Sequence, residues 1–189
     1  GRVWVPEMEM DSLAGFLQTK WVIHDDLIVK AGVRRESIDL SVDDYETLKL
    51  CRSETQCSVP LQVKGDTIDY DATTYNIAIK YNWSDSFSPF FNYSQGSDIA
   101  DIGRLLRAAT VDDIGLIQTE ASIIDNYEVG FTSLFDQVRL EVAAYRSTSE
   151  LGTTNSFNEV TGVYEPVRAP QEIWGYEGLV DYRISETLN

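Results

Sequence analysis

The sequence predicts an all-β fold, an antiparallel up-and-down meander of about seven strands. Three observations predict it. Apolar and polar residues alternate with a period of two along the whole chain, whereas the 3.6-residue period of helices is scarce. Short and long connections alternate between the predicted strands, and large aromatic residues lie close to the short ones.

Each predicted strand has one apolar face and one charged face. In the second strand, Val29 and Val33 share a face and Lys30 lies on the other. The predicted strands are 13–24, 27–38, 75–83, 87–94, 123–134, 138–147 and roughly 174–184. A soluble β-sandwich buries such an apolar face, and a membrane barrel turns it toward lipid. Alternation alone leaves both architectures open.

The connections are more informative than the strands. Short turns are expected near 24–26, 84–86 and 135–137, and long connections over 39–74, 95–122 and roughly 149–170. In a meander this order puts every short turn at one end of the sheet. Outer-membrane barrels have this asymmetry, with tight periplasmic turns and long extracellular loops. Compact soluble domains rarely contain structureless loops longer than about 12–15 residues.

Aromatic residues near the turns indicate an interface between membrane and water. The residues concerned are Trp21, Trp83, Phe87, Phe135 and Tyr182. Amphipathic rings gather at the level of lipid headgroups and form girdles around barrels. Aromatic residues are also common in strands generally, and that is the alternative explanation.

Composition excludes several classes of function. The 189 residues include 31 acidic and 15 basic ones, a net charge of −16 that disfavours binding to nucleic acid. His24 is the only histidine, and we expect it to be an exposed turn residue. No catalytic pair or metal site stands out, so we expect neither an enzyme nor a cofactor. The sequence contains no run of 18 apolar residues, so no transmembrane helix is predicted.

The two cysteines, Cys51 and Cys57, lie six residues apart in a polar stretch. In an oxidising compartment they can close a small ring, and we predict a disulfide between them. Two free thiols in a cytosolic loop are the alternative. The first residues show no basic region followed by an apolar stretch, so no signal peptide is expected in residues 1–189.

Four stretches in order resemble the TonB-dependent outer-membrane receptors, the siderophore and vitamin transporters of Gram-negative bacteria. Residues 13–21 with 26–36 resemble a strand pair of that family. The stretch Ser-Pro-Phe-Phe-Asn-Tyr-Ser-Gln-Gly at 88–96 is similar to its aromatic-rich strand, although Ser97 stands where the family has an aromatic. Residues 120–130 contain Asn-Tyr-Glu-Val-Gly, and residues 174–178 resemble a further strand. Each motif is weak alone, and the four together are fairly specific.

The resemblance implies a 22-stranded transmembrane barrel with a plugged lumen. Residues 1–189 would supply about seven strands of it, without the plug domain. It further implies a protein of the cell outer membrane that takes up a ferric siderophore or similar nutrient without covalent chemistry. The expected partners are that small ligand, the protein's own plug domain, TonB and outer-membrane lipid. The competing hypothesis is a secreted soluble β-sandwich used for binding or adhesion.

The motifs that resemble the family carry over no ligand-contacting residue, so candidate ligand-binding residues are inferred from the sequence itself. Arg104 and Arg107 are spaced to share one face of a helical turn, where two guanidinium groups could clamp an anionic ferric complex. Pairing with neighbouring aspartates is the alternative, and the acidic surroundings favour it. The pair Asp69 and Asp71 could offer oxygens to calcium, but a solvated acidic loop explains them better.

A set of charged residues on the polar faces predicts the wall of a lumen. Its members are Lys30, Arg34, Lys80, Glu128, Arg139, Glu141, Glu177, Asp181 and Arg183.

Overall fold

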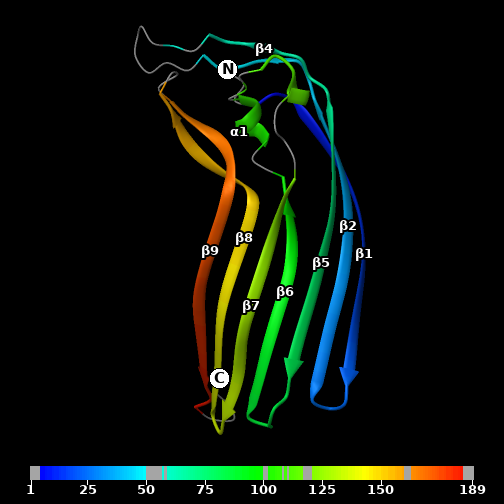
Figure 1. Cartoon of the computed structure of the whole chain (residues 1–189), viewed down its shortest axis with the longest axis vertical. Coiled ribbons are helices and arrows are strands. Elements are labelled where there is room, and N and C mark those ends of the chain that lie inside the picture. The colour runs from blue at the N-terminus through cyan, green and yellow to red at the C-terminus, as the bar shows by residue number, and fades with distance from the viewer. Residues whose placement is uncertain are drawn as a thin grey trace.

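The computed structural model describes residues 5–49, 57, 59–99, 102–107, 109, 111–116, 121–159 and 163–184. Seven strands form one antiparallel sheet in the order β1-β2-β5-β6-β7-β8-β9, so neighbours in the sheet follow one another along the chain (Figure 1). Their bounds are Met8–Ile23 (β1), Leu27–Val42 (β2), Thr67–Tyr81 (β5), Phe87–Asp98 (β6), Ser122–Phe135 (β7), Val138–Asn158 (β8) and Val163–Tyr182 (β9). The predicted seven-stranded meander is confirmed.

All three short turns lie at one end of the sheet, as expected (Figure 1). They join β1 to β2, β5 to β6 and β7 to β8. His24 and Asp136 adopt positive φ angles of 56° and 48° in the first and third turns. A left-handed residue lets the chain reverse within a few positions, and aspartate tolerates that conformation better than most residues do. His24 is exposed in its turn, as predicted.

The opposite end carries the long connections and four short elements. Between β2 and β5 lie strands β3 (Tyr45–Glu46) and β4 (Gln62–Val63), which pair with each other. Between β6 and β7 lie helix α1 (Ile102–Arg107) and a 3-10 turn, Ile114–Leu116. Among the described residues, no helix has the length and hydropathy needed to cross a membrane.

The strands extend further toward this end than the sequence predicted. The prediction of a long connection over 149–170 is wrong, because β8 and β9 continue as a paired hairpin to Asn158 and Val163. The pairing has one irregularity, between Ser149 and Gly152. The other two long connections shorten in the same way. In the added part of β8 and β9 no clear alternation marks the strand. In β2 and β5 the alternation continues, but the apolar residues change to the inner face, where Leu40, Val42 and Tyr70 are buried.

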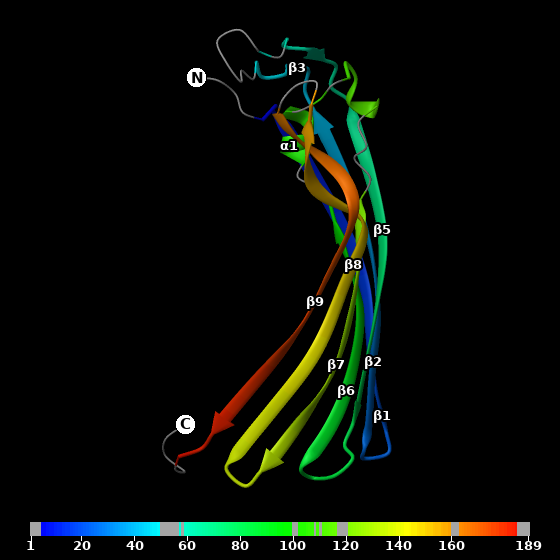
Figure 2. The ribbon, with the colours of Figure 1, turned by 60° about the vertical axis from the view of Figure 1, so that its left-hand side comes forward.

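The register defines two faces of the sheet. One continuous row across the seven strands consists of Trp21, Val29, Ile79, Phe91, Val129, Ala144 and Tyr176. We call this apolar side the outer face and the opposite side the inner face. The sheet is curved along its strands (Figure 2). A single curved sheet with its apolar row exposed does not fit a sandwich, in which that row would be buried between two sheets.

The most buried side chains lie at the loop end of the inner face. Leu40, Val42 and Tyr70 from β2 and β5 pack there with residues of the long connections. The partners from those connections are Val63, Leu106 and Ile114, and Leu106 and Ile114 have no exposed surface. In Figures 1 and 2 helix α1 lies at this end of the sheet. The core therefore joins the loops to the sheet rather than joining two sheets.

Candidate functional site: the inner face and the loop cap

The outer face has an apolar band with an aromatic ring at each edge. The predicted aromatic residues near the turns are all exposed, at 49% for Trp21 and 60% for Phe135. A second group, missed in the sequence, lies further from the turns and comprises Tyr75, Tyr93, Tyr127 and Trp174. On β9, Trp174 and Tyr182 are eight positions apart, about 27 Å along a strand and roughly 20 Å across a bilayer at the usual tilt. The separation of the two aromatic groups across the bilayer therefore suits a membrane.

Polar contacts begin on the outer face just beyond the second aromatic group. The hydroxyl of Tyr93 donates to Oδ1 of Asp125 at 2.7 Å. Arg146 pairs with Glu172 at 3.0 Å on the neighbouring strands. Ion pairs of this kind belong in water or among headgroups, so they mark the upper edge of the band.

The inner face carries the predicted charged wall. The register places the members that lie within strands on this face, and Arg183 follows directly after β9. Glu128 accepts a hydrogen bond of 2.9 Å from the amide of Asn92 on the next strand. Arg139 pairs with Glu141 at 2.9 Å, and it lies directly opposite Asp181.

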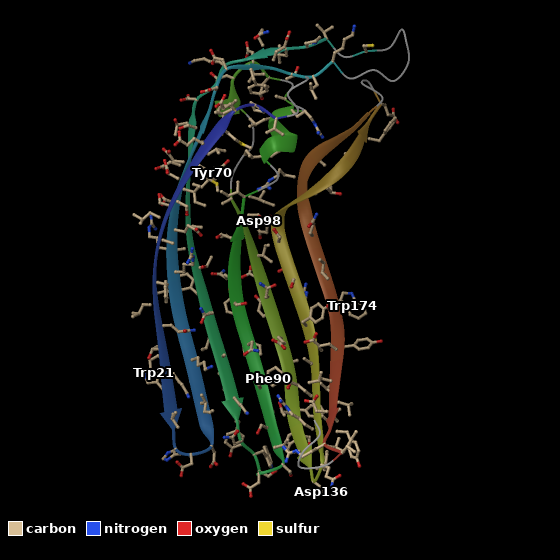
Figure 3. The ribbon with its side chains drawn as sticks, turned by 180° about the vertical axis from the view of Figure 1, so that it is seen from behind. Trp21, Tyr70, Phe90, Asp98, Asp136 and Trp174 are labelled. Atoms are coloured by element: carbon tan, nitrogen blue, oxygen red, sulfur yellow. The ribbon has the colours of Figure 1, made fainter. Side chains whose placement is uncertain are left out.

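Charged residues of both signs line a hollow of about 420 Å³ on this face. Three lysines lie on one side, on β1, β2 and β5, and Glu128, Glu141 and Arg139 lie on the other, on β7 and β8. Phe90 lies between the two sides, near the turn end (Figure 3). An occupant of this hollow would meet charges of both signs and an apolar centre.

A second hollow of about 390 Å³ lies on the inner face at the loop end. Its lining is mainly apolar and includes Ile38, Leu40 and Ile102, with Glu36 and Asp98 among its polar members. Tyr70 and Asp98 lie below α1 in Figure 3. The hollow therefore lies where the strands meet the long connections.

The two long connections are bound into one unit, which we call the loop cap (the described residues of 43–66 and 99–121). The backbone of Lys64 donates to the carbonyl of Asp112 at 2.8 Å and accepts from Ile114 at 3.3 Å. The hydroxyl of Tyr45 donates to the carbonyl of Leu106 at 2.7 Å. Burial raises the pKa of Tyr45 to about 12, so this donor keeps its proton at physiological pH. These bonds and the shared core hold the cap together.

The predicted clamp residues both belong to α1, at positions i and i+3 of one short helix. Arg107 is partly exposed and has a partner within the protein. The side chain of Arg104 lies outside the described residues, so the clamp stays a prediction.

The predicted disulfide also stays a prediction. Cys51 lies outside the described residues, although no described cysteine is a free thiol.

The acidic pair Asp69 and Asp71 lies on strand β5 rather than in a loop, which corrects the expected solvated acidic loop. Both lie on the outer face, and Asp71 pairs with Arg35 at 3.4 Å. The strand continues here because its partner β2 also extends, to Val42. In the described part of the chain, no cluster of three or more acidic, histidine or cysteine residues could hold a metal ion.

Comparisons with known proteins agree with this architecture. The family described as "TonB dependent receptor-like, beta-barrel" matches residues 2–189. The ferric aerobactin receptor of Klebsiella pneumoniae is 24% identical over 96% of this chain and 26% of that protein. The rhizobactin receptor of Rhizobium meliloti is 23% identical over 95% of this chain and 26% of that protein. The chain thus spans about a quarter of the length of these relatives.

Solved structures share the fold. The copper transporter OprC superposes with a TM-score of 0.75 at 11% identity, over 95% of this chain and 28% of that one. The ferric yersiniabactin uptake receptor FyuA from Yersinia pestis superposes with a TM-score of 0.69 at 16% identity, over 95% of this chain and 25% of that one. The family is one of receptors rather than enzymes. The chain belongs to the TonB-dependent receptor β-barrel family and forms a seven-stranded segment of an outer-membrane barrel.

Proposed function

We propose that the full-length protein takes up a ferric siderophore, or a similarly scarce nutrient, across the outer membrane. The observation that carries the proposal is the similarity of nearly the whole chain to receptors named for ferric aerobactin and rhizobactin. Energy for uptake would come through TonB, and the protein's own plug domain would fill the lumen.

The loop cap is the part of this segment best suited to capture ligand. It lies at the end with the long connections, which in outer-membrane barrels is the extracellular end. Its helix α1 carries Arg104 and Arg107, and guanidinium groups bind carboxylate or hydroxamate oxygens through paired, charge-assisted hydrogen bonds. In a chain with a net charge of −16, such a pair would offset repulsion of an anionic complex.

Binding of ferric siderophores to cells that express the full-length protein under iron limitation tests the proposal. We expect saturable binding of one siderophore class, and iron uptake that depends on TonB. A double variant, Arg104→Gln with Arg107→Gln, should weaken binding about tenfold to a hundredfold, the effect of losing a charge-assisted contact.

Arg35→Gln is the matched control, because Arg35 lies on the outer face and pairs with Asp71 away from the cap. It should bind like the wild type. Unchanged affinity in the double variant would disprove the clamp and leave uptake standing. Absence of binding and uptake for catecholate, hydroxamate and carboxylate siderophores would disprove the ferric siderophore assignment.

A further inference from the structure

The hollow at the loop end of the inner face differs in chemistry from the hollow near the turns. Most of its lining is apolar, and the lining residues come from both the sheet and the loop cap. Strands β2 and β5 supply Ile38, Leu40 and Ala72, and the cap supplies Ile102 and Ala121. Two parts of the chain that are far apart in the sequence thus enclose one apolar space.

Several of these apolar side chains keep exposed surface where lipid does not reach them. Ile38, Ala72 and Ala121 are only partly buried. The hollow lies on the inner face, and Ala72 is three positions beyond Tyr75 of the second aromatic group, outside the apolar band. Apolar surface left in contact with water is unfavourable, so an occupant with apolar surface of its own would be bound here.

The charged groups of the lining exclude an anionic occupant. Glu36 and Asp98 are the two charged residues that line the hollow, and no basic residue of the described chain joins them there. Glu36 pairs with Arg34 at 3.1 Å, whereas the side chain of Asp98 makes no ion pair or hydrogen bond with another described residue. An anionic iron centre would be repelled from this space, and a neutral chain would not.

The size of the hollow suits an extended apolar group. Its volume is about 390 Å³. An apolar cavity of about 150 Å³ is already large enough to bind benzene, and ligand sites in proteins usually begin at about 300 Å³. The hollow therefore has room for a longer hydrocarbon chain.

The hollow lies beside the predicted arginine clamp. Helix α1 contributes Ile102 to the lining and carries Arg104 and Arg107 two and five positions later. These spacings correspond to about 3 and 8 Å along a helix axis. One ligand of moderate size could therefore reach both the helix and the hollow.

We propose that the hollow binds an aliphatic chain of the imported nutrient, so that the substrate is an amphiphile with an anionic iron-bearing head and a fatty acyl arm. The inference rests on the proposed function and narrows its substrate class. The cap and the wall together form the site for the chain, and the head stays outside the hollow, away from Glu36 and Asp98.

Paired ferric complexes test the inference in cells that express the full-length protein under iron limitation. The two members of a pair share a catecholate, hydroxamate or carboxylate head, and one member also carries a decanoyl chain. Burial of a few methylene groups is enough for a large gain in affinity, so we expect the acylated member of the recognised pair to bind at least about tenfold more tightly.

A variant that fills the hollow separates this gain from partition of the chain into the bilayer. Ala72→Phe puts a ring into the hollow and should remove most of the acylated member's advantage. Ala31→Phe is the matched control, because Ala31 lies on the outer face of β2, where the ring meets lipid, and it should keep the advantage. The readout is the ratio of the two affinities, which a lower amount of folded protein does not change.

Photolabelling of the wild-type protein needs no variant. A diazirine at the end of the decanoyl chain reacts on illumination with the groups that surround it. We expect mass spectrometry to find the label in residues 36–42, 68–72 or 102–107. Labels confined to other parts of the protein would overturn the proposal.

The inference and the proposed function fail in different ways. Equal affinity of both members of the recognised pair would disprove the chain site and leave siderophore uptake standing. An advantage that persists in Ala72→Phe would assign the gain to the bilayer and overturn the inference. Absence of binding by every complex would remove the proposed nutrient and, with it, the amphiphilic substrate.

Discussion

Single residues on the inner face show how closely neighbouring strands pack. The ring of Phe90 lies across Gly130, its partner on β7, so that a β-carbon on this glycine would lie 2.6 Å from Cζ of Phe90 and closer still to the carbonyl oxygen of Val142. Tyr145 covers Gly175 in the same way. A large side chain thus fills the space that a glycine leaves on the next strand, as in designed barrels.

Replacement of this glycine should be costly. We expect Gly130→Ala to destabilise the full-length protein by about 1–3 kcal/mol, because the added methyl forces both a ring and a backbone carbonyl to move. Gly15→Ala is the control, since a β-carbon there meets no atom within 4 Å. Thermal unfolding in detergent measures both. An equal midpoint for the two variants would contradict the packing argument.

The turn between β7 and β8 depends on one backbone conformation. Asp136 has a φ of 48°, a region that aspartate and asparagine tolerate and β-branched residues do not. We expect Asp136→Val to cost about 1–2 kcal/mol and Asp136→Asn to be neutral. The same unfolding measurement compares them, and a neutral valine variant would show that the turn has another conformation available.

At the scale of elements, the long connections prove to be structured. The sequence predicted their positions, because short turns and long connections alternate, but it did not predict that two of them share a core. No hydrophobic period in the sequence marks the loop residues of that core. Val63, Leu106 and Ile114 come from segments far apart along the chain and meet only in the folded structure. The ends of β2 and β5 were missed for a related reason, since their apolar residues, such as Leu40 and Tyr70, change from the outer to the inner face, where this core buries them.

The bond between Tyr45 and Leu106 tests whether the loop cap moves as one unit. We expect Tyr45→Phe to reduce hydrogen-exchange protection of α1 about fivefold, the effect of losing roughly 1 kcal/mol from one hydrogen bond. Tyr75→Phe is the control, because the hydroxyl of Tyr75 makes no hydrogen bond with a described residue. Unchanged protection in the Tyr45 variant would show that the two connections move independently.

The burial of the Tyr45 hydroxyl predicts a pH dependence. The pKa of Tyr45 is raised from its usual value near 10 to about 12, so its stabilising contribution is fully present below pH 10 and is lost as the pH rises through 12. Protection factors in the cap, corrected for intrinsic exchange, should therefore be constant from about pH 6 to 9. A loss of protection within that range would assign the cap's stability to other groups.

At the scale of the whole molecule, the two faces of the sheet could be predicted and their extent could not. The alternation of Val29 with Lys30 placed one on each face, and the register confirms it. The aromatic girdle near the turns was found because turns are visible in the sequence. The second group, with Tyr127 and Trp174, was missed because nothing local marks the upper edge of a membrane within a continuous strand.

The assignment of the outer face to lipid makes the strongest prediction about the intact protein. Val129 lies in the apolar row on β7 and is 58% exposed, and Thr132 lies three positions away on the inner face. Arginine costs about 2–4 kcal/mol at the middle of a bilayer and about 0–1 kcal/mol near its interfaces, whereas a lumen position is wet. Val129 lies between the two aromatic groups, two positions from Tyr127 and six from Phe135, so we expect Val129→Arg to make folding into vesicles less favourable by about 1–3 kcal/mol. Thr132→Arg should have little effect, because Glu141 lies directly opposite on β8 and can pair with the new charge. The heat-modifiable mobility of refolded protein measures both. If the two variants fold equally well, the outer face does not contact hydrocarbon, and the barrel assignment of this sheet is wrong.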